Sequence, residues 1–75
     1  MKDNVNHPDH YTNGSVECID AMKAMMTGST ASPILCAWWG LAFKYIWRWD
    51  KKDVPVEDLK KIIFYLNKMI SELEK

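Results

Sequence analysis

The sequence predicts an all-α protein with three helices, and three observations support that fold class. Apolar residues recur at spacings of three and four along three separate segments, which is the period of an amphipathic helix. Ser and Pro residues stand where these segments begin, as is typical of helix starts. No stretch alternates apolar and polar residues as a strand would. The 75 residues are expected to form a single small domain, 1–75.

The N-terminal part of the chain is expected to be an arm followed by a short helix. Residues 1–14 are polar and include Pro8 and Gly14, so they predict a non-helical arm. Ser15 is a suitable N-cap for a helix predicted over residues 15–26. The apolar face of that helix would hold Val16, Ile19, Met22 and Met26.

The second predicted helix covers residues 33–49. Gly28 suits the left-handed position after the first helix, and Ser32 with Pro33 forms a cap followed by Pro in the first turn. Its heptad-like stripe consists of Leu35, Trp38, Ala42, Tyr45 and Trp49.

The third predicted helix covers residues 55–74 and begins at Pro55. A charged turn of a few residues joins it to the second helix, so the two are expected to form an αα-hairpin that the first helix caps. Its stripe consists of Leu59, Ile62, Leu66, Met69 and Leu73.

The chain has more aromatic residues than so small a domain can bury. It contains four Trp, three Tyr and two Phe, and 48% of its residues are hydrophobic. Trp39, Phe43 and Trp47 lie outside the hairpin stripe of the second helix. We therefore expect a homo-oligomer in which these three residues contact another subunit.

Charge and hydropathy narrow the class of protein. Ten basic and ten acidic residues give a net charge of zero, which disfavours a partner of duplex nucleic acid. The longest apolar stretch, residues 34–43, is too short to span a bilayer, so no membrane contact is expected. Two cysteines and no apolar leader indicate reduced thiols and a cytoplasmic protein.

Lys44 and Arg48 are the strongest candidates for ligand binding. They are four residues apart, which places them on one side of a helix. A guanidinium and an ammonium group together suit a phosphate. The alternative is that both cations simply pair with acidic neighbours, namely Asp50, Asp53, Glu57 or Asp58. If Arg48 binds ligand only, Arg48→Ala is expected to abolish binding with little loss of fold.

A second candidate group lies in the arm, in the segment His7-Pro8-Asp9-His10-Tyr11. His7, His10 and Tyr11 could hydrogen-bond or stack on a ligand, or Tyr11 could simply pack on the helices. A zinc site would need a third ligand of suitable geometry and the chain has no other His, so neither a metal nor another cofactor is expected.

The third helix carries the remaining candidates. Asp58, Lys61 and Tyr65 share one flank of it, while Glu57 and Lys61 are spaced as an ion pair. Phe64 falls among lysines on the polar side and is expected at an interface. The sequence lacks the glycine-rich phosphate loop of a conventional kinase.

Four motifs in series resemble a family of small phage proteins described as SaV-like or nucleotide-kinase-like. Residues 7–11 read H-P-D-H-Y, 14–20 read G-S-V-E-C-I-D, 40–48 read G-L-A-F-K-Y-I-W-R, and 57–66 read E-D-L-K-K-I-I-F-Y-L. The resemblance implies a phage protein in the bacterial cytoplasm, a nucleotide-type ligand and a homo-oligomer. Leu41 replaces the family's Asn, and Trp49-Asp50 its Ala-Gly.

We therefore expect a nucleotide-binding protein that sequesters a nucleotide-derived immune signal, such as a cyclic ADP-ribose-type molecule or a cyclic dinucleotide, in an inter-subunit pocket. Such a protein would counter host defence without catalysis. The substitutions at Leu41 and at Trp49-Asp50 disfavour the family's enzymatic activity, whereas Lys44 and Arg48 remain in place to bind phosphate. A nucleoside monophosphate kinase, a nucleotide hydrolase and an inhibitor of a host protein remain the alternatives.

Overall fold

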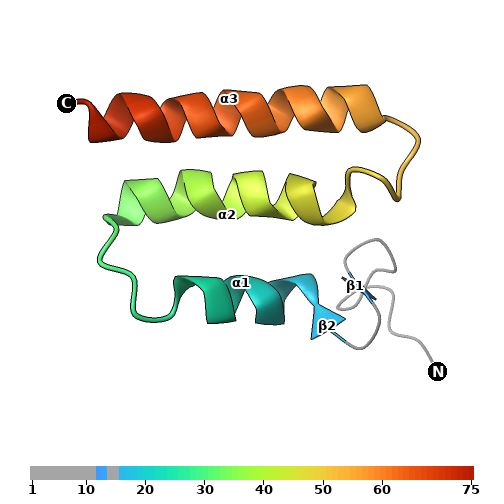
Figure 1. The fold of residues 1–75 in the computed structure, drawn as a ribbon, viewed down its shortest axis with the longest axis horizontal. Helices are drawn as coiled ribbons and strands as arrows, with labels where there is room; N and C mark the ends of the chain where they lie inside the picture. The colour runs from blue at the N-terminus through green and yellow to red at the C-terminus, as the bar shows by residue number, and fades with distance from the viewer. Residues whose placement is uncertain (1–11, 14–15) are drawn as a thin grey trace.

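The computed structural model describes residues 12–13 and 16–75, and this part of the chain forms three helices and one short hairpin (Figure 1). The helices are α1 (Cys18–Met26), α2 (Pro33–Arg48) and α3 (Pro55–Leu73). The strands are β1 (Thr12–Asn13) and β2 (Val16–Glu17). The prediction of a mainly helical fold with three helices is confirmed.

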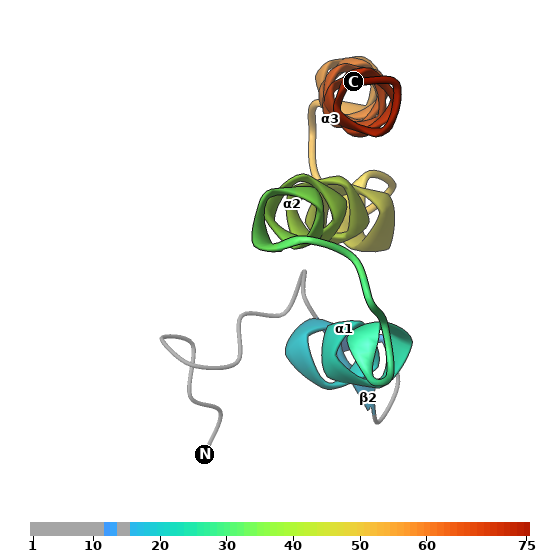
Figure 2. The same cartoon turned by 90° about the vertical axis from the view of Figure 1, so that its left-hand side faces the viewer.

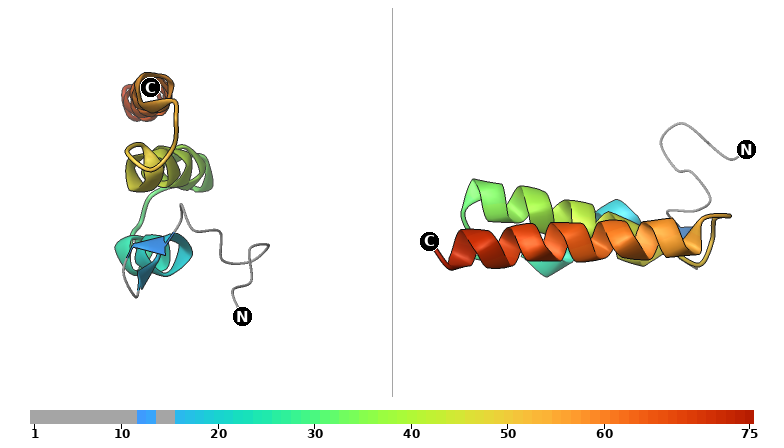
Figure 3. Two further views of the ribbon diagram at one scale, coloured as in Figure 1. Left: turned by 90° about the vertical axis from the view of Figure 1, so that its right-hand side faces the viewer. Right: turned by 90° about the horizontal axis from the view of Figure 1, so that it is seen from above.

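The three helices lie side by side in one row, with α2 in the middle (Figures 1 and 2). Neighbouring helices run in opposite directions along the row. Seen from above, α3 covers much of the other two helices, which confirms that they form a single layer (Figure 3). The first helix therefore extends the hairpin of α2 and α3 on one side, whereas the sequence predicted that it would cap that hairpin.

The N-terminal helix begins later than the prediction of residues 15–26, because the residues before Cys18 form a strand. The two strands pair in antiparallel register, with Thr12 opposite Glu17. This hairpin corrects the expectation that the chain has no strands. Glu17 occupies the N-cap position and makes no capping hydrogen bond with its side chain. Ser15, which was expected there, lies outside the described residues.

The turn between α1 and α2 has the predicted chemistry. Gly28 adopts a φ of +82°, a left-handed conformation that favours glycine. The hydroxyl of Ser32 accepts a hydrogen bond from the backbone N–H of Leu35 at 3.3 Å, and Pro33 opens α2. These two residues define the start of α2. Ser32 accepts a hydrogen bond from a backbone N–H that has no partner within the helix, and Pro33 has no N–H to satisfy.

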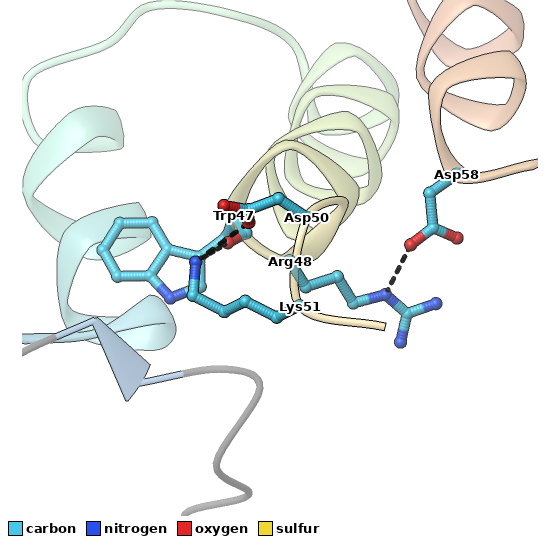
Figure 4. Close-up of polar contacts among 5 residues, drawn as sticks. All are labelled: Trp47, Arg48, Asp50, Lys51 and Asp58. Carbon is cyan, nitrogen blue, oxygen red and sulfur yellow. Dashed lines mark hydrogen bonds and ion pairs between the residues drawn. The ribbon is translucent and has the colours of Figure 1, made fainter. Parts of the chain in front are cut away.

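The second helix ends at Arg48, one residue before the predicted end, because Lys51 closes it. The backbone N–H of Lys51 donates to the carbonyl of Arg48 at 2.9 Å. Its Nζ donates to the carbonyl of Trp47 at 3.2 Å (Figure 4). Helix α3 begins at Pro55 as predicted and ends at Leu73, one residue short of the prediction.

The row of helices has a small apolar core. Cys18, Ala42 and Ile62 are the buried apolar residues of the described part of the chain. Asp58 is buried as well, although it carries a carboxylate. A single layer cannot enclose much surface, since each helix has a neighbour on only one or two sides.

The face that α3 turns toward α2 differs from the predicted stripe. Ile62 is buried and Met69 half-buried, as expected, but Leu59, Leu66 and Leu73 are exposed. Buried Asp58 and half-buried Tyr65 take their places. Helix α3 is thus rotated about its axis, and it leaves a row of aliphatic side chains in solvent.

Candidate functional site

A buried ion pair links the end of α2 to the start of α3. Nε of Arg48 lies 3.5 Å from Oδ2 of Asp58, and the Asp58 side chain is 0% exposed (Figure 4). Neither carboxylate oxygen accepts a hydrogen bond from any described residue. Asp58 also stands in the first turn of α3, where the helix dipole favours a negative charge. The pair therefore holds Arg48 in one position by charge, since a buried carboxylate needs a compensating cation.

Tyr45 is the centre of the surrounding cluster. The Cζ atom of Arg48 lies 4.5 Å from the centroid of the Tyr45 ring, and Nζ of Lys61 lies 5.1 Å from the same centroid. Two cations from different helices thus meet at one aromatic ring, which attracts both through its negative face. The predicted ion pair of Lys61 with Glu57 is not among the contacts of the described residues.

A ladder of aromatic rings continues from Tyr45 along the contact between α2 and α3. The ring of Tyr65 stacks between those of Tyr45 and Trp38, at 5.9 Å from each. Phe64 meets the edge of Tyr65 at 5.5 Å, and Nζ of Lys68 lies 5.3 Å from the Phe64 centroid. Both sides of Tyr65 are therefore occupied by neighbouring rings, whereas Phe64 is 53% exposed.

Lys44 acts on the other neighbour of α2. Burial raises the pKa of the Cys18 thiol above its ordinary value, and the positive charge of Lys44 partly offsets that rise. Lys44 is therefore within electrostatic reach of the start of α1, whereas Arg48 contacts α3. Lys44 and Arg48 both make interactions in addition to these.

Four cations share one broad side of the helix row. Arg48 and Lys61 meet over Tyr45 and so lie on the same side. Lys44 precedes Arg48 by four residues, so these two share one side of α2. Lys68 follows Lys61 by seven residues, so these two share one side of α3. We call these four residues the cationic face. The same helical spacing places Glu57 beside Lys61 and Glu72 beside Lys68, so this side of the row also carries acidic groups.

The structure brings four of the predicted site residues together: Arg48, Asp58, Lys61 and Tyr65. His7, His10 and Tyr11 lie outside the described residues. Tyr45 was not among the predicted site residues, because its place in the heptad stripe identified it with the core. Its position three residues before Arg48 was the signal that could have found it.

The aromatic residues predicted to form a subunit contact are partly covered within one chain. Trp39, Phe43 and Trp47 are each half-buried. The rings of Phe43 and Trp47 lie 5.6 Å apart. The Trp47 indole leaves α2 on the side away from Arg48 and Asp58 (Figure 4). Whether these three residues contact another subunit stays a prediction.

Comparison with known families places the chain. A family model matches residues 5–67, from before the His7 segment to the second half of α3. The chain belongs to the family described as protein of unknown function, DUF3310. The DUF3310 match includes Arg48, Asp58, Lys61 and Tyr65. No curated protein and no solved structure matches the chain at a significant level.

The described part of the chain has neither a metal-binding cluster nor a membrane-spanning helix. No three His, Cys, Asp or Glu side chains there come close enough together to hold a metal ion. None of its helices is both long enough and apolar enough to cross a membrane. The candidate site of the described residues is the cationic face, because Arg48 and Lys61 both contact Tyr45 there.

Proposed function

We propose that this DUF3310 protein binds a nucleotide-derived molecule on its cationic face and holds it without converting it. The meeting of Arg48 and Lys61 over Tyr45, with Lys44 and Lys68 on the same side, carries the proposal. Several cations on one surface attract anions, and guanidinium and ammonium groups suit phosphate oxygens.

In this proposal Arg48 and Lys61 contact the phosphate groups and Asp58 is a positioning residue. The buried carboxylate engages Nε of Arg48 and holds the guanidinium against Tyr45. Preorganisation of this kind reduces the side-chain entropy that binding would otherwise cost. Lys44 would add charge at longer range, on the α1 side of the same face.

Phe64 is the described aromatic side chain best suited to stack on a base. It is 53% exposed, and Lys68 lies beside its ring. Stacking on an exposed ring favours bases without demanding a particular one. Tyr65 is the neighbouring aromatic candidate on α3, but its contacts with Trp38 and Tyr45 leave it better suited to packing.

The ligand class and the biological setting rest on sequence resemblance. The four motifs resemble small phage nucleotide-kinase-like proteins, which favours a nucleotide ligand and a role in the cytoplasm of an infected bacterium. There the protein would sequester a signal such as a cyclic ADP-ribose-type molecule or a cyclic dinucleotide, and so counter host defence. Leu41, where the family pattern has Asn, favours sequestration over turnover.

Isothermal titration calorimetry against a panel of linear and cyclic nucleotides, ADP-ribose derivatives and inorganic phosphate tests the proposal. We expect one nucleotide class to bind with a Kd of about 1 μM or tighter. Lys61→Gln should weaken that binding about tenfold, equivalent to about 1.4 kcal/mol. Lys52→Gln is the matched control, because Lys52 is exposed in the turn between α2 and α3. Its effect should stay below about twofold.

Two results would contradict the proposal. One is the absence of nucleotide binding by a folded protein. The other is a diphosphate product when the protein is incubated with ATP and each deoxynucleoside monophosphate, because that product identifies a kinase.

Higher salt should weaken binding to the cationic face, since exposed charges are screened.

A further inference from the structure

A row of aliphatic side chains runs along the length of α3 in solvent. Its six members are between 40% and 68% exposed, a large fraction for residues of this kind. They follow one another at spacings of 3, 4, 3, 4 and 3 residues, which is the spacing of a coiled-coil contact stripe. We call them the aliphatic stripe: Val56, Leu59, Ile63, Leu66, Ile70 and Leu73.

The aliphatic stripe lies on the side of the helix row away from the cationic face. Residues two apart on an α-helix point about 200° apart. Ile63 follows Lys61 by two residues and Ile70 follows Lys68 by two, so both turn away from those lysines. On α2, Ile46 stands two residues before Arg48 and is 47% exposed. One broad side of the layer thus carries cations and the other carries aliphatic groups.

We propose that the aliphatic stripe docks against the same stripe of a second copy of this chain. The stripe itself contains no charged residue, and the two charged residues that border it at helical spacing, Lys60 and Glu74, carry opposite signs. Its heptad spacing allows each side chain to fit between those of an identical helix. A stripe of about 26 Å, from residue 56 to residue 73, is long enough for such a contact.

The need for a second layer comes from the core. Three buried apolar residues in the described part of the chain are few for a stable domain of this size. A stable protein–protein contact takes about 800 Å² from each partner. Six half-exposed aliphatic side chains on α3, extended by Ile46 on α2, supply most of such an area. Packing one layer on another is how helices ordinarily bury an apolar side.

This dimer would leave the two cationic faces on opposite outer sides. Each copy would then bind ligand by itself, whereas the sequence predicted a pocket enclosed between subunits. The proposal rests on the exposure and spacing of α3 residues and not on the proposed ligand.

Analytical ultracentrifugation of the full chain and of two variants tests the contact. The wild type should sediment as a dimer, and Ile63→Glu should shift the mass to that of one chain. Ile19→Glu is the matched control, because Ile19 is 63% exposed and Ile63 58%, but Ile19 lies on α1. This control should keep the wild-type mass. Two results would overturn the proposal: a folded wild type that is monomeric, and an Ile63→Glu protein that keeps the wild-type mass. A monomeric wild type would indicate that a different protein binds the stripe.

A milder pair of variants keeps the test decisive if Ile63→Glu fails to fold. Ile63→Ala should raise the dimer dissociation constant at least about tenfold relative to Ile19→Ala, because it removes buried aliphatic area. The melting temperature of the wild type should also rise with protein concentration. Equal dissociation constants for the two Ala variants would overturn the proposal.

Discussion

The two contacts that α2 makes with its neighbours are built from different chemistry. Toward α3, α2 presents Arg48 to a buried carboxylate and aromatic rings to Tyr65. Toward α1, it presents Gly40, whose missing side chain would lie 3.5 Å from the tips of Met22 and Met26. The first contact uses groups with strict partners, whereas the second uses flexible thioethers next to a glycine.

The difference shows which contact fixes the register of the helices. A charge pair and a ring stack are satisfied in one arrangement only, because a small rotation would separate the ions and unstack the rings. Methionines can refill space after a shift of the same size. We infer that the α2–α3 contact holds the fold and the site in place, and that the α1–α2 contact adjusts to it.

The largest predicted effect comes from breaking the ion pair. Arg48→Ala should lower the free energy of unfolding by about 3 kcal/mol, because it strands the buried Asp58 carboxylate. Arg48 is itself only 11% exposed, so its packing on Tyr45 is lost as well. Urea denaturation followed by circular dichroism measures the change. The expectation from sequence was that Arg48→Ala would leave the fold nearly intact, and the contact of Arg48 with the buried Asp58 carboxylate favours the larger loss.

A double variant separates the ion pair from simple loss of packing. Arg48→Ala with Asp58→Ala should be more stable than Arg48→Ala alone, because the stranded charge is gone. A double variant as unstable as the sum of the two single variants would show that the pair contributes no coupling.

An intermediate effect is predicted for the ring ladder. Tyr65→Leu should lower the free energy of unfolding by about 1–3 kcal/mol more than Phe64→Leu does, since it removes two stacked ring pairs, worth about 0.5–1.5 kcal/mol each, in addition to the edge contact that both variants lose. Phe64→Leu is the matched control on the next residue, because Phe64 makes one edge contact and is half exposed. It should cost less than about 1 kcal/mol. Equal losses would remove the special role given to Tyr65.

The smallest effect is predicted on the other side of α2. Gly40→Ala should leave the free energy of unfolding unchanged or raise it by up to about 1 kcal/mol, because Ala favours a helix interior more than Gly. The added Cβ would meet Met22 and Met26 at 3.5 Å, an ordinary van der Waals distance, and those side chains can move. Thermal unfolding measures the change. A marked loss of stability would show that this contact is as strict as the one with α3.

Local signals were enough to predict most of the fold from sequence. Helix starts at Pro33 and Pro55 and the turn at Gly28 follow from the backbone requirements of these residues, and the structure agrees. The short hairpin before Cys18 was missed, since two-residue strands leave no alternating pattern to read.

The face that α3 turns toward α2 could not be predicted from the apolar pattern. The predicted stripe and the row that faces α2 share Ile62 and Met69, and both rows have residues at spacings of three and four. The sequence predicted that the leucines of the stripe would pack against α2, but in the structure Asp58 and Tyr65 face α2 instead. An apolar pattern cannot register that Arg48 needs a carboxylate partner or that Tyr65 fits between two rings.

The same limit applies to the candidate site. Arg48, Asp58 and Lys61 were predicted one by one from charge and helix position. That they meet at Tyr45 depends on the pairing of two helices, which a single sequence does not specify. The grouping of cations on one side and aliphatic residues on the other became visible only once the helices were known to form a single layer.

Native mass spectrometry of the wild-type protein with its best-bound nucleotide tests the central claim, that the layer has one side for a ligand and one for a second copy. We expect an ion with the mass of two chains carrying up to two nucleotides, and the same two-chain ion without nucleotide. A single chain that carries nucleotide would contradict the role of the aliphatic stripe. A dimer that binds no nucleotide would contradict the role of the cationic face.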